Sequence, residues 1–372
     1  MLYLDNSATT PLLPEVRDAM LPYLLEEFGN PSSKYYSKAM NANTAVEQAR
    51  ENVSILLGCK AEELTFTSGS TETNNMILKG TANYYQTKGK HIITSKAEHP
   101  SILDTCEFLE SKGFHITYLD VDQYGRVSVE MLENALTDDT ILVSLMWGNN
   151  ELGSLNPIKE ISALCKEKGI LFHTDATQVV GKIDFSLEEY PGISFLSCSA
   201  HKFHGPKGTG VSFIRRDEYG VPIPVTPLLH GGGQESGIRS GTLAVHNIVG
   251  MGKAAELAND HLVKNISKLN RLEEKLTTLL NEKFGSNIVF NNDTGNKIPG
   301  ILNVQFKGVN NEILVKKLAP IIAVSTGSAC SSSKPSHVLS SIGLTLNEIR
   351  NTVRFSLSHL ITEEDLMVFK SL

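Results

Sequence analysis

The chain has 372 residues, of which 41% are hydrophobic and 20% are charged, as in an ordinary globular protein long enough for two lobes. Its formal net charge of −7 argues against a broad nucleic-acid-binding face, so no direct nucleic-acid binding is expected. The five widely spaced cysteines include no CxxC pair and the eleven histidines form no HExxH motif, which argues against a disulfide framework and against a metal site.

The N-terminal sequence MLYLDNSATT lacks a basic start followed by an apolar run, so no signal peptide is predicted. No stretch approaches the roughly eighteen apolar residues that a membrane span requires. Reduced thiols suit an intracellular compartment. These features together predict a cytoplasmic protein with no membrane partner.

Short β-rich runs alternate with helical stretches from about residue 64 to residue 216. Most runs are continuously apolar, which is typical of strands buried on both faces of a sheet. The strand candidates are residues 64–67, 91–95, 115–121, 141–147, 170–175, 193–197 and 210–215, with crossover helices expected at 71–87, 102–112 and 159–168. The pattern predicts an α/β sandwich with a mostly parallel sheet.

A glycine-rich segment, HGGGQESGIRSGT at 230–242, ends this region and precedes a long helical stretch over 245–283. The rest mixes short strands with helices, as in a smaller α+β unit. The strands are expected at 301–306 and 352–357, and the helices at 311–318 and 363–369. We therefore expect a large domain formed by residues 12–250 and a small α+β domain formed by residues 1–11 and 251–372.

Three strand ends carry candidate chemistry, because open α/β sheets bind ligands outside the carboxyl ends of their strands. After residue 67, the sequence SGSTET opens a helix and could bind a phosphate, although a capping box alone is the simpler interpretation. Asp175 could pair with a protonated pyridine nitrogen or simply cap a helix. Lys202 could form a Schiff base with pyridoxal phosphate (PLP). The three together, in this order, favour a PLP site.

Other side chains could act beside that site. His99 could move protons near neutral pH, or could be a structural histidine. Cys330 lies in a small, polar, glycine-containing segment, where an exposed loop could present it as a nucleophile or as an incidental thiol. Arg354 interrupts an apolar strand and could hold a carboxylate by two parallel hydrogen bonds, or could face solvent. Cys198, inside FLSCSA, is interpreted as a small buried residue.

Taken together, these segments resemble the class V aminotransferase-like cysteine desulfurases of the NifS/IscS kind, which have PLP fold type I. The matching segments are YLDNSATTP (3–11), NPSS (30–33), FTSGSTETNN (66–75), HIITSKAEHPSILDT (91–105), NNELG (149–153), HTDATQ (173–178), SAHKFHGPKGTG (199–210), GGGQESGIRSGT (231–242), GSAC (327–330) and VRFSLS (353–358). They span almost the whole chain. The resemblance implies a mixed, mostly parallel seven-stranded sheet in the large domain and a homodimer with active sites at the subunit interface.

The resemblance further implies an enzyme that removes sulfur from L-cysteine, releases L-alanine and keeps the sulfur as a persulfide on Cys330 for an acceptor protein. Lys202 is then the Schiff-base lysine, and His99 stacks on the PLP ring and transfers protons. Asn150 and Arg354 grip the substrate carboxylate. The implied cofactor-binding residues are Ser70, Thr71, His99, Asn150, Asp175 (at the pyridine nitrogen), Gln178 (at the phenolic oxygen), Ser199, His201, Lys202 and, from a second subunit, Thr242. Asn6, Ser7 and Thr9 are expected to border the active site.

Two departures concern sulfur delivery. The segment between Cys330 and Pro335 is shorter than in housekeeping IscS members, and the chain ends at Leu372 without the extension that docks the iron–sulfur scaffold in those members. Both weaken the case for scaffold docking and leave the chemistry unchanged, so iron–sulfur cluster assembly, tRNA thiolation and DNA phosphorothioation stay open.

Other activities fit the same scaffold. The alternatives are a selenocysteine lyase or another PLP-dependent C–S lyase, an aminotransferase, and a non-catalytic partner protein. The intact set of Lys202, Asp175, His99 and Cys330 argues against a non-catalytic partner, because a docking subunit needs none of these residues.

Overall fold

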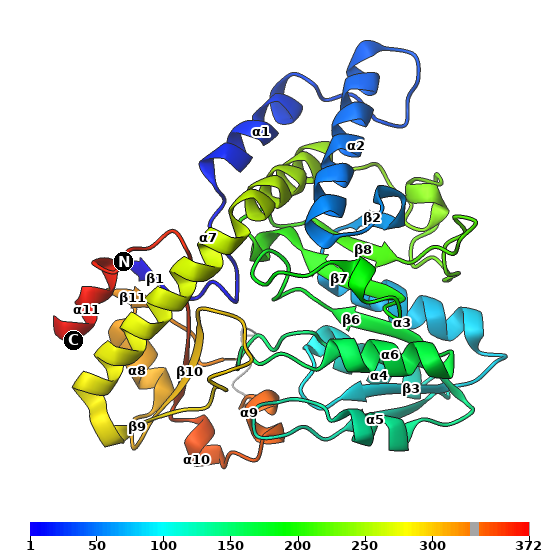
Figure 1. The fold of residues 1–372 in the computed structure, drawn as a ribbon. Helices are drawn as coiled ribbons and strands as arrows, with labels where there is room; N and C mark the ends of the chain where they lie inside the picture. The colour runs from blue at the N-terminus through cyan, green and yellow to red at the C-terminus, as the bar shows by residue number, and fades with distance from the viewer. Residues whose placement is uncertain (328–334, 372) are drawn as a thin grey trace.

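A single sheet of seven strands forms the larger part of the computed structural model, which describes residues 1–327 and 335–371 (Figure 1). The strand order is β2-β8-β7-β6-β5-β3-β4. The five strands from β7 to β4 run parallel to one another, whereas β8 is antiparallel to both β2 and β7. The strands are β2 (Leu64–Thr67), β3 (His91–Ser95), β4 (His115–Leu119), β5 (Thr140–Ser144), β6 (Leu171–Asp175), β7 (Phe195–Ser199) and β8 (Gly210–Ile214). The mixed, mostly parallel sheet confirms the predicted fold class.

Every strand predicted for this sheet is present, but some predicted boundaries were wrong. Strand β5 ends at Ser144 and not at residue 147. The apolar run continues because Leu145 and Trp147 remain beside β6, donating backbone N–H groups to the carbonyls of His173 and Asp175. The apolar run therefore predicted correctly which residues are buried, but the regular hydrogen bonding of the strand ends before the run does.

Neighbouring residues on β3 and on β7 enter different cores, because side chains alternate between the two faces of a sheet. Ile92 and Phe195 pack in one core with α3 (Ser70–Tyr85) and α4 (Pro100–Glu110). Ile93 and Leu196 pack in another core with α5 (Val129–Ala135) and α6 (Ile158–Lys168). Helices thus cover both faces of the sheet (Figure 1), which explains why the strands are apolar throughout.

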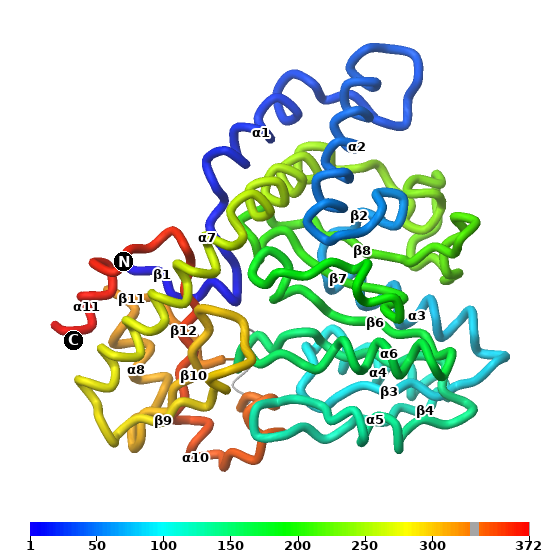
Figure 2. The backbone as a smooth tube through the Cα atoms, viewed as in Figure 1, coloured from blue at the N-terminus to red at the C-terminus, as the bar shows by residue number. Residues whose placement is uncertain are grey.

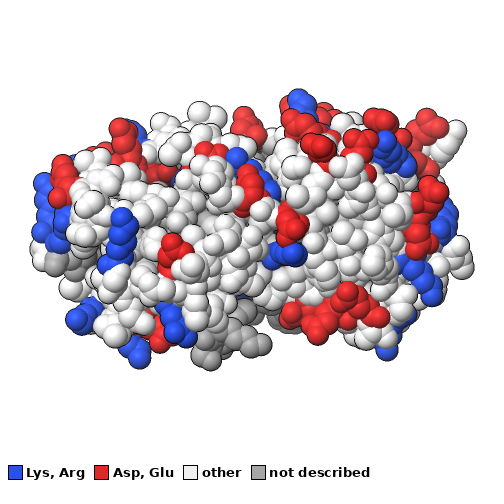
Figure 3. Space-filling model, turned by 90° about the horizontal axis from the view of Figure 1, so that it is seen from below, with Lys and Arg blue, Asp and Glu red and all other residues white. Residues whose placement is uncertain are grey.

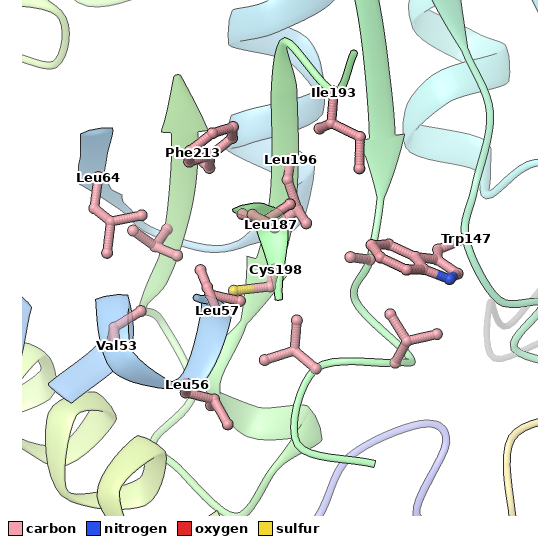
Figure 4. Close-up of a cluster of buried hydrophobic side chains, with 14 of the residues drawn as sticks. Val53, Leu56, Leu57, Leu64, Trp147, Leu187, Ile193, Leu196, Cys198 and Phe213 are labelled. Carbon is pink, nitrogen blue, oxygen red and sulfur yellow. The ribbon is translucent and has the colours of Figure 1, made fainter. Parts of the chain in front are cut away.

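Two early helices, α1 (Pro14–Leu25) and α2 (Ser37–Leu57), were not predicted. The inward stripe of α2 begins with small alanines, which give a weak helical signal, and its last turns reach the core, where Val53 and Leu57 lie near Leu196 and Cys198 (Figure 4). Both helices pack against the long helix α7 (Val245–Phe284). Cys198 is fully buried, as its apolar surroundings predicted.

A smaller unit gathers around the second half of α7. Its antiparallel sheet has the order β12-β10-β9, formed by β9 (Ile288–Phe290), β10 (Ile301–Phe306) and β12 (Thr352–Ser356). The N-terminal strand β1 (Leu2–Tyr3) pairs with β11 (Ile322–Ala323), and both chain ends lie at this unit (Figure 2). The remaining helices are α8 (Asn311–Leu318), α9 (His337–Ser341), α10 (Leu346–Ile349) and α11 (Val368–Ser371).

Helix α7 joins the two units, because Met251 belongs to a core of the large sheet and Leu276 to the core of the smaller one. The domain limits, residues 12–250 for the large domain and 1–11 with 251–372 for the small one, stay a prediction. On the face shown in Figure 3, acidic and basic side chains are interspersed. Within the described residues, no helix has both the length and the apolar character needed to span a bilayer.

Candidate active site

The carboxyl ends of β6 and β7 place Asp175 and Lys202 at one edge of the sheet. Asp175 is the last residue of β6, and Lys202 closes the single 3-10 turn Ala200–Lys202 that follows β7. The two strands are parallel neighbours, with Asp175 opposite Ser197. The parallel arrangement thus brings a carboxylate and an amine to adjacent strand ends.

The Lys202 ammonium is held by the N-terminal segment. Its Nζ donates hydrogen bonds to the carbonyl oxygens of Ser7 at 2.6 Å and Ala8 at 2.8 Å. Burial, aided by the Arg354 charge and opposed by Asp175 and Asp5, lowers the pKa of Lys202 to about 8. A larger fraction of such a lysine is neutral at physiological pH than of a lysine with the ordinary pKa. The neutral amine is the form that attacks a carbonyl carbon.

Hydroxyl groups converge at the N-terminus of α3. The Ser70 N–H and hydroxyl both contact Ser199 Oγ, at 2.7 and 2.8 Å, and Thr177 Oγ1 donates to Ser70 Oγ at 2.5 Å. Gly69 precedes the helix at φ 147°, which side chains rarely adopt, and a Cβ there would lie 3.3 Å from Ser199 Oγ. The first N–H groups of a helix have no partner within it, so this cradle fits a phosphate group.

Thr71 lies exposed in the same helical turn. The next residue, Glu72, accepts a hydrogen bond from the Ser68 N–H at 2.7 Å and pairs with Arg239 at 2.8 Å. Arg239 belongs to the glycine-rich segment 230–242, which therefore contacts the cradle within one chain. Thr242 lies exposed on that segment, and its predicted reach into a second subunit stays a prediction.

Asp175 is fixed by two donors, neither of which was predicted from the sequence. Asn74 Nδ2 donates to Asp175 Oδ2 at 2.8 Å, and the Thr177 N–H donates to Oδ1 at 3.0 Å. Asn74 also donates to Ser101 Oγ at 2.9 Å. Both oxygens of the buried carboxylate are therefore oriented by the protein itself.

The two predicted histidines of the site, His99 and His201, each have a hydrogen-bond partner at Nδ1. His99 Nδ1 lies 2.8 Å from Ser101 Oγ and accepts the Ser101 N–H at 3.1 Å. Burial lowers the pKa of His99, as do the Lys202 and His337 charges, while Asp175 opposes the shift. Burial also lowers the pKa of His201 to about 4, and its Nδ1 lies 3.2 Å from Thr9 Oγ1.

Gln178 shares an acceptor with Lys202. Its Nε2 donates to the Ser7 carbonyl at 2.9 Å, while its Oε1 accepts a hydrogen bond from Lys182 Nζ at 3.2 Å. Burial lowers the pKa of Lys182 to about 7, with the Lys202 and Arg354 charges acting in the same direction. No signal in the sequence VVGK distinguishes Lys182 from a surface lysine. Ser7 and its neighbour Asn6 are almost fully buried.

Arg354 is fully buried, which excludes an outward-facing role on a half-exposed strand. Its guanidinium donates to Asp5 Oδ1 at 2.7 Å, to the Asn150 carbonyl at 2.9 Å and to the Gly327 carbonyl at 3.2 Å. Its Nε is buried and has no hydrogen-bond partner among the described residues. Arg354 therefore retains a donor that a substrate carboxylate could use. Asp5 was not predicted.

Cys330 lies outside the described residues, within 328–334. The described residues on either side of that segment meet at one side chain, Glu151. Glu151 Oε2 accepts a hydrogen bond from Ser336 Oγ at 2.7 Å, and a Cβ built on Gly327 would lie 2.6 Å from the same oxygen. Since Gly327 also contacts Arg354, both flanks of 328–334 lie beside the predicted carboxylate-binding residues.

The residues present fit PLP. A hydroxyl cradle at a helix N-terminus suits its phosphate, and a fixed buried carboxylate suits its pyridine nitrogen. Lys202, with its lowered pKa, suits its aldehyde carbon. The three groups come from α3, β6 and the end of β7. Strands β6 and β7 are neighbours in the sheet, and α3 packs against both.

Known proteins with similar sequences and structures also point to a PLP enzyme. The family described as Aminotransferase class-V matches residues 2–369. A cysteine desulfurase IscS of Dictyoglomus turgidum is 47% identical over 368 residues, covering 98% of this chain and 91% of the relative. A solved NifS-like protein is 37% identical with a TM-score of 0.92, covering 100% of this chain and 97% of its own. The solved structure of SspA in complex with cysteine is 37% identical with a TM-score of 0.84, covering 96% of this chain and 99% of its own.

These matches extend over nearly the whole length of both partners, and the curated relative is named a desulfurase rather than a lyase. The chain belongs to the aminotransferase class-V family, and within it to the PLP-dependent cysteine desulfurases of the NifS/IscS kind.

Proposed function

We propose that the chain moves the sulfur of L-cysteine onto Cys330, which becomes a persulfide while the carbon skeleton leaves as L-alanine. The bond between Cβ and sulfur breaks, and a sulfur–sulfur bond forms on Cys330. The electron pair of the broken bond stays on Cβ, which takes up a proton. The observation that carries this proposal is that Gly327 and Ser336, on either side of the Cys330 segment, both contact Glu151 beside Arg354.

The cofactor would be held by residues already in place. Ser70, Thr71, Ser199 and the N-terminus of α3 would hold the PLP phosphate, with Thr177 supporting Ser70. Asp175 would face the pyridine nitrogen, Gln178 the phenolic oxygen, and His99 and His201 would lie beside the ring. When bound, PLP serves as an electron sink for the bonds at the substrate Cα.

The chain's own residues orient the substrate and move its protons. Arg354 and Asn150 would fix the cysteine carboxylate, which places the Cα–H near the proton carriers. Lys202 can exchange a proton near neutral pH, since its pKa is lowered to about 8. His99 is the second carrier. The Cys330 thiolate would then attack the substrate sulfur.

Several broader features belong to the same proposal. Residues 12–250 form the PLP-binding domain, and residues 1–11 with 251–372 form the small domain that carries Cys330. Two chains form a homodimer in the cytoplasm, where Thr242 of a second subunit completes the phosphate site. The persulfide passes to an acceptor protein of iron–sulfur cluster assembly, tRNA thiolation or DNA phosphorothioation.

A Cys330→Ala variant tests the assignment. We expect alanine production from cysteine to be abolished while the visible absorbance of bound PLP is unchanged. Cys59→Ala, which changes a half-buried thiol outside the proposed site, is the matched control and should retain full activity. If Cys330→Ala still turned cysteine over to pyruvate and sulfide at the original rate, the chain would be a C–S lyase instead.

A further inference from the structure

A chain of hydrogen-bonded polar side chains, three of them buried and His99 partly buried, links Asp175 to His99. The order is Asp175, Asn74, Ser101 and His99, with contacts of 2.8, 2.9 and 2.8 Å. Asn74 is fully buried, and Asp175 and Ser101 are 6% and 9% exposed. The links come from β6, from α3 and from the start of α4, so the chain joins one strand of the sheet to two helices.

The direction of each hydrogen bond in this chain is determined by chemistry. The Asn74 amide nitrogen carries two hydrogens, and it contacts two acceptors, Asp175 Oδ2 and Ser101 Oγ. Turning the amide round would set its carbonyl oxygen against the Asp175 carboxylate, which is repulsive. Because Ser101 Oγ accepts from Asn74, its own hydrogen is available for His99 Nδ1.

A second donor acts on the same nitrogen. His99 is the N-cap of α4, and its Nδ1 accepts the backbone N–H of Ser101 at 3.1 Å. A backbone N–H can only donate, so this contact requires a lone pair on Nδ1. Both contacts therefore exclude a proton from Nδ1.

We infer that Asn74 and Ser101 are positioning residues that keep the single imidazole proton of His99 on Nε2. Proton exchange by His99 then takes place at Nε2, on the side of the ring away from Ser101. The inference rests on the proposed function for its role in the reaction, but the position of the proton is a property of the protein that can be measured without turnover.

The test is nitrogen NMR of the PLP-loaded protein with isotope-labelled histidine. The His99 signals are identified by their loss in His99→Gln. We expect the wild-type protein to show a neutral His99 with a protonated Nε2 and a bare, hydrogen-bonded Nδ1. In Ser101→Ala, Nδ1 loses the hydroxyl donor and keeps the backbone N–H of residue 101. We therefore expect a higher pKa for His99 and an Nδ1 signal shifted toward that of a weaker hydrogen bond.

Matched variants separate this role from a general effect on α4. Ser111→Ala makes the same substitution at the exposed C-cap of α4, where the hydroxyl bonds the Phe108 carbonyl, and should leave His99 unchanged. Ser101→Thr keeps a hydroxyl and should restore the wild-type signals. Asn74→Ala should shift His99 in the same direction as Ser101→Ala, but less, because the Ser101 hydroxyl remains.

A wild-type His99 protonated on Nδ1 would overturn the inference, as would a Ser101→Ala variant with unaltered His99 signals. The wild-type measurement decides the question even if Ser101→Ala does not fold. The proposed function has its own test, because it fails if the Cys330→Ala variant still converts cysteine to pyruvate and sulfide.

Discussion

The carboxylate of Glu151 accepts a hydrogen bond from the hydroxyl of Ser336 at 2.7 Å, between residues 185 positions apart in the sequence. Burial raises the pKa of Glu151, against the opposing effects of Ser336, Arg354 and His337. Gly327 lies over the same carboxylate oxygen at φ 103°, where a Cβ would collide with it. One buried side chain therefore joins both described flanks of the segment that contains Cys330.

Removing this contact should slow sulfur transfer without affecting PLP binding. In Ser336→Ala, the buried Glu151 carboxyl loses a hydrogen-bond donor, which costs about 1–3 kcal/mol. We expect the rate of persulfide formation to fall roughly ten-fold. The rate is measured from the single-turnover release of alanine.

Two variants control for a general effect of this substitution. Ser341→Ala, on the same helix α9, removes a hydroxyl whose one partner among the described residues is the Val338 carbonyl, and this variant should be active. Ser336 also caps α9 through the Leu339 N–H at 3.1 Å, so Ser336→Thr, which keeps both contacts, should recover the rate. A Ser336→Ala rate equal to that of Ser341→Ala would show that Glu151 does not position this segment.

Arg354→Lys should impair the use of cysteine far more than the binding of PLP. Lysine cannot reproduce the planar fork that spans Asp5, Asn150 and Gly327. We expect kcat/KM for cysteine to fall about 100-fold, corresponding to roughly 3 kcal/mol, with unaltered PLP absorbance. Arg350→Lys, at an exposed position four residues earlier, is the matched control. An unchanged kcat/KM in Arg354→Lys would remove Arg354 from the substrate site.

Glu98 provides a pH-dependent stability test. Burial raises the pKa of this fully buried carboxyl to about 8, against hydrogen bonds from Met146 and Ser95, while Asp175 adds to the shift. In the unfolded chain the Glu98 carboxyl ionises near pH 4.5. Between about pH 4.5 and pH 8, Glu98 therefore loses its proton in the unfolded state and keeps it in the folded state. The contribution of Glu98 to stability is therefore full below pH 4.5 and is lost as the pH rises to 8.

Glu98→Gln removes this titration and keeps the side-chain volume. We expect the unfolding free energy of the wild type to fall relative to the variant by roughly 1.4 kcal/mol per pH unit over that range. Thermal unfolding midpoints at pH 5, 7 and 9 would measure it. Glu107→Gln, exposed on α4, should follow the wild type at each pH. Parallel pH profiles for Glu98→Gln and the wild type would contradict a neutral buried Glu98.

Sequence patterns were sufficient for the sheet and for the strand-end residues. Continuous apolar runs mark strands covered on both faces, and the carboxyl ends of parallel strands meet at one edge, so Asp175 and Lys202 could be paired in advance. The helices α1 and α2 were missed because Pro22 interrupts α1 and the inward face of α2 begins with alanines.

The supporting polar residues could not be predicted, because their partners are distant in the sequence. Asp5 meets Arg354 across 349 positions, and Asn74 meets Asp175 across 101. Asn74 follows a helix start rich in polar residues, where an asparagine is typical of an exposed face. Only the folded arrangement of α3 against β6 reveals that it is buried and donates to a carboxylate.

The most direct test of sulfur capture is mass spectrometry of the alkylated protein after one addition of cysteine, without a reductant or an acceptor. The account predicts one additional sulfur atom on the peptide that contains Cys330, and none on Cys59, Cys106, Cys165 or Cys198. Formation of alanine with no additional sulfur on Cys330 would contradict it.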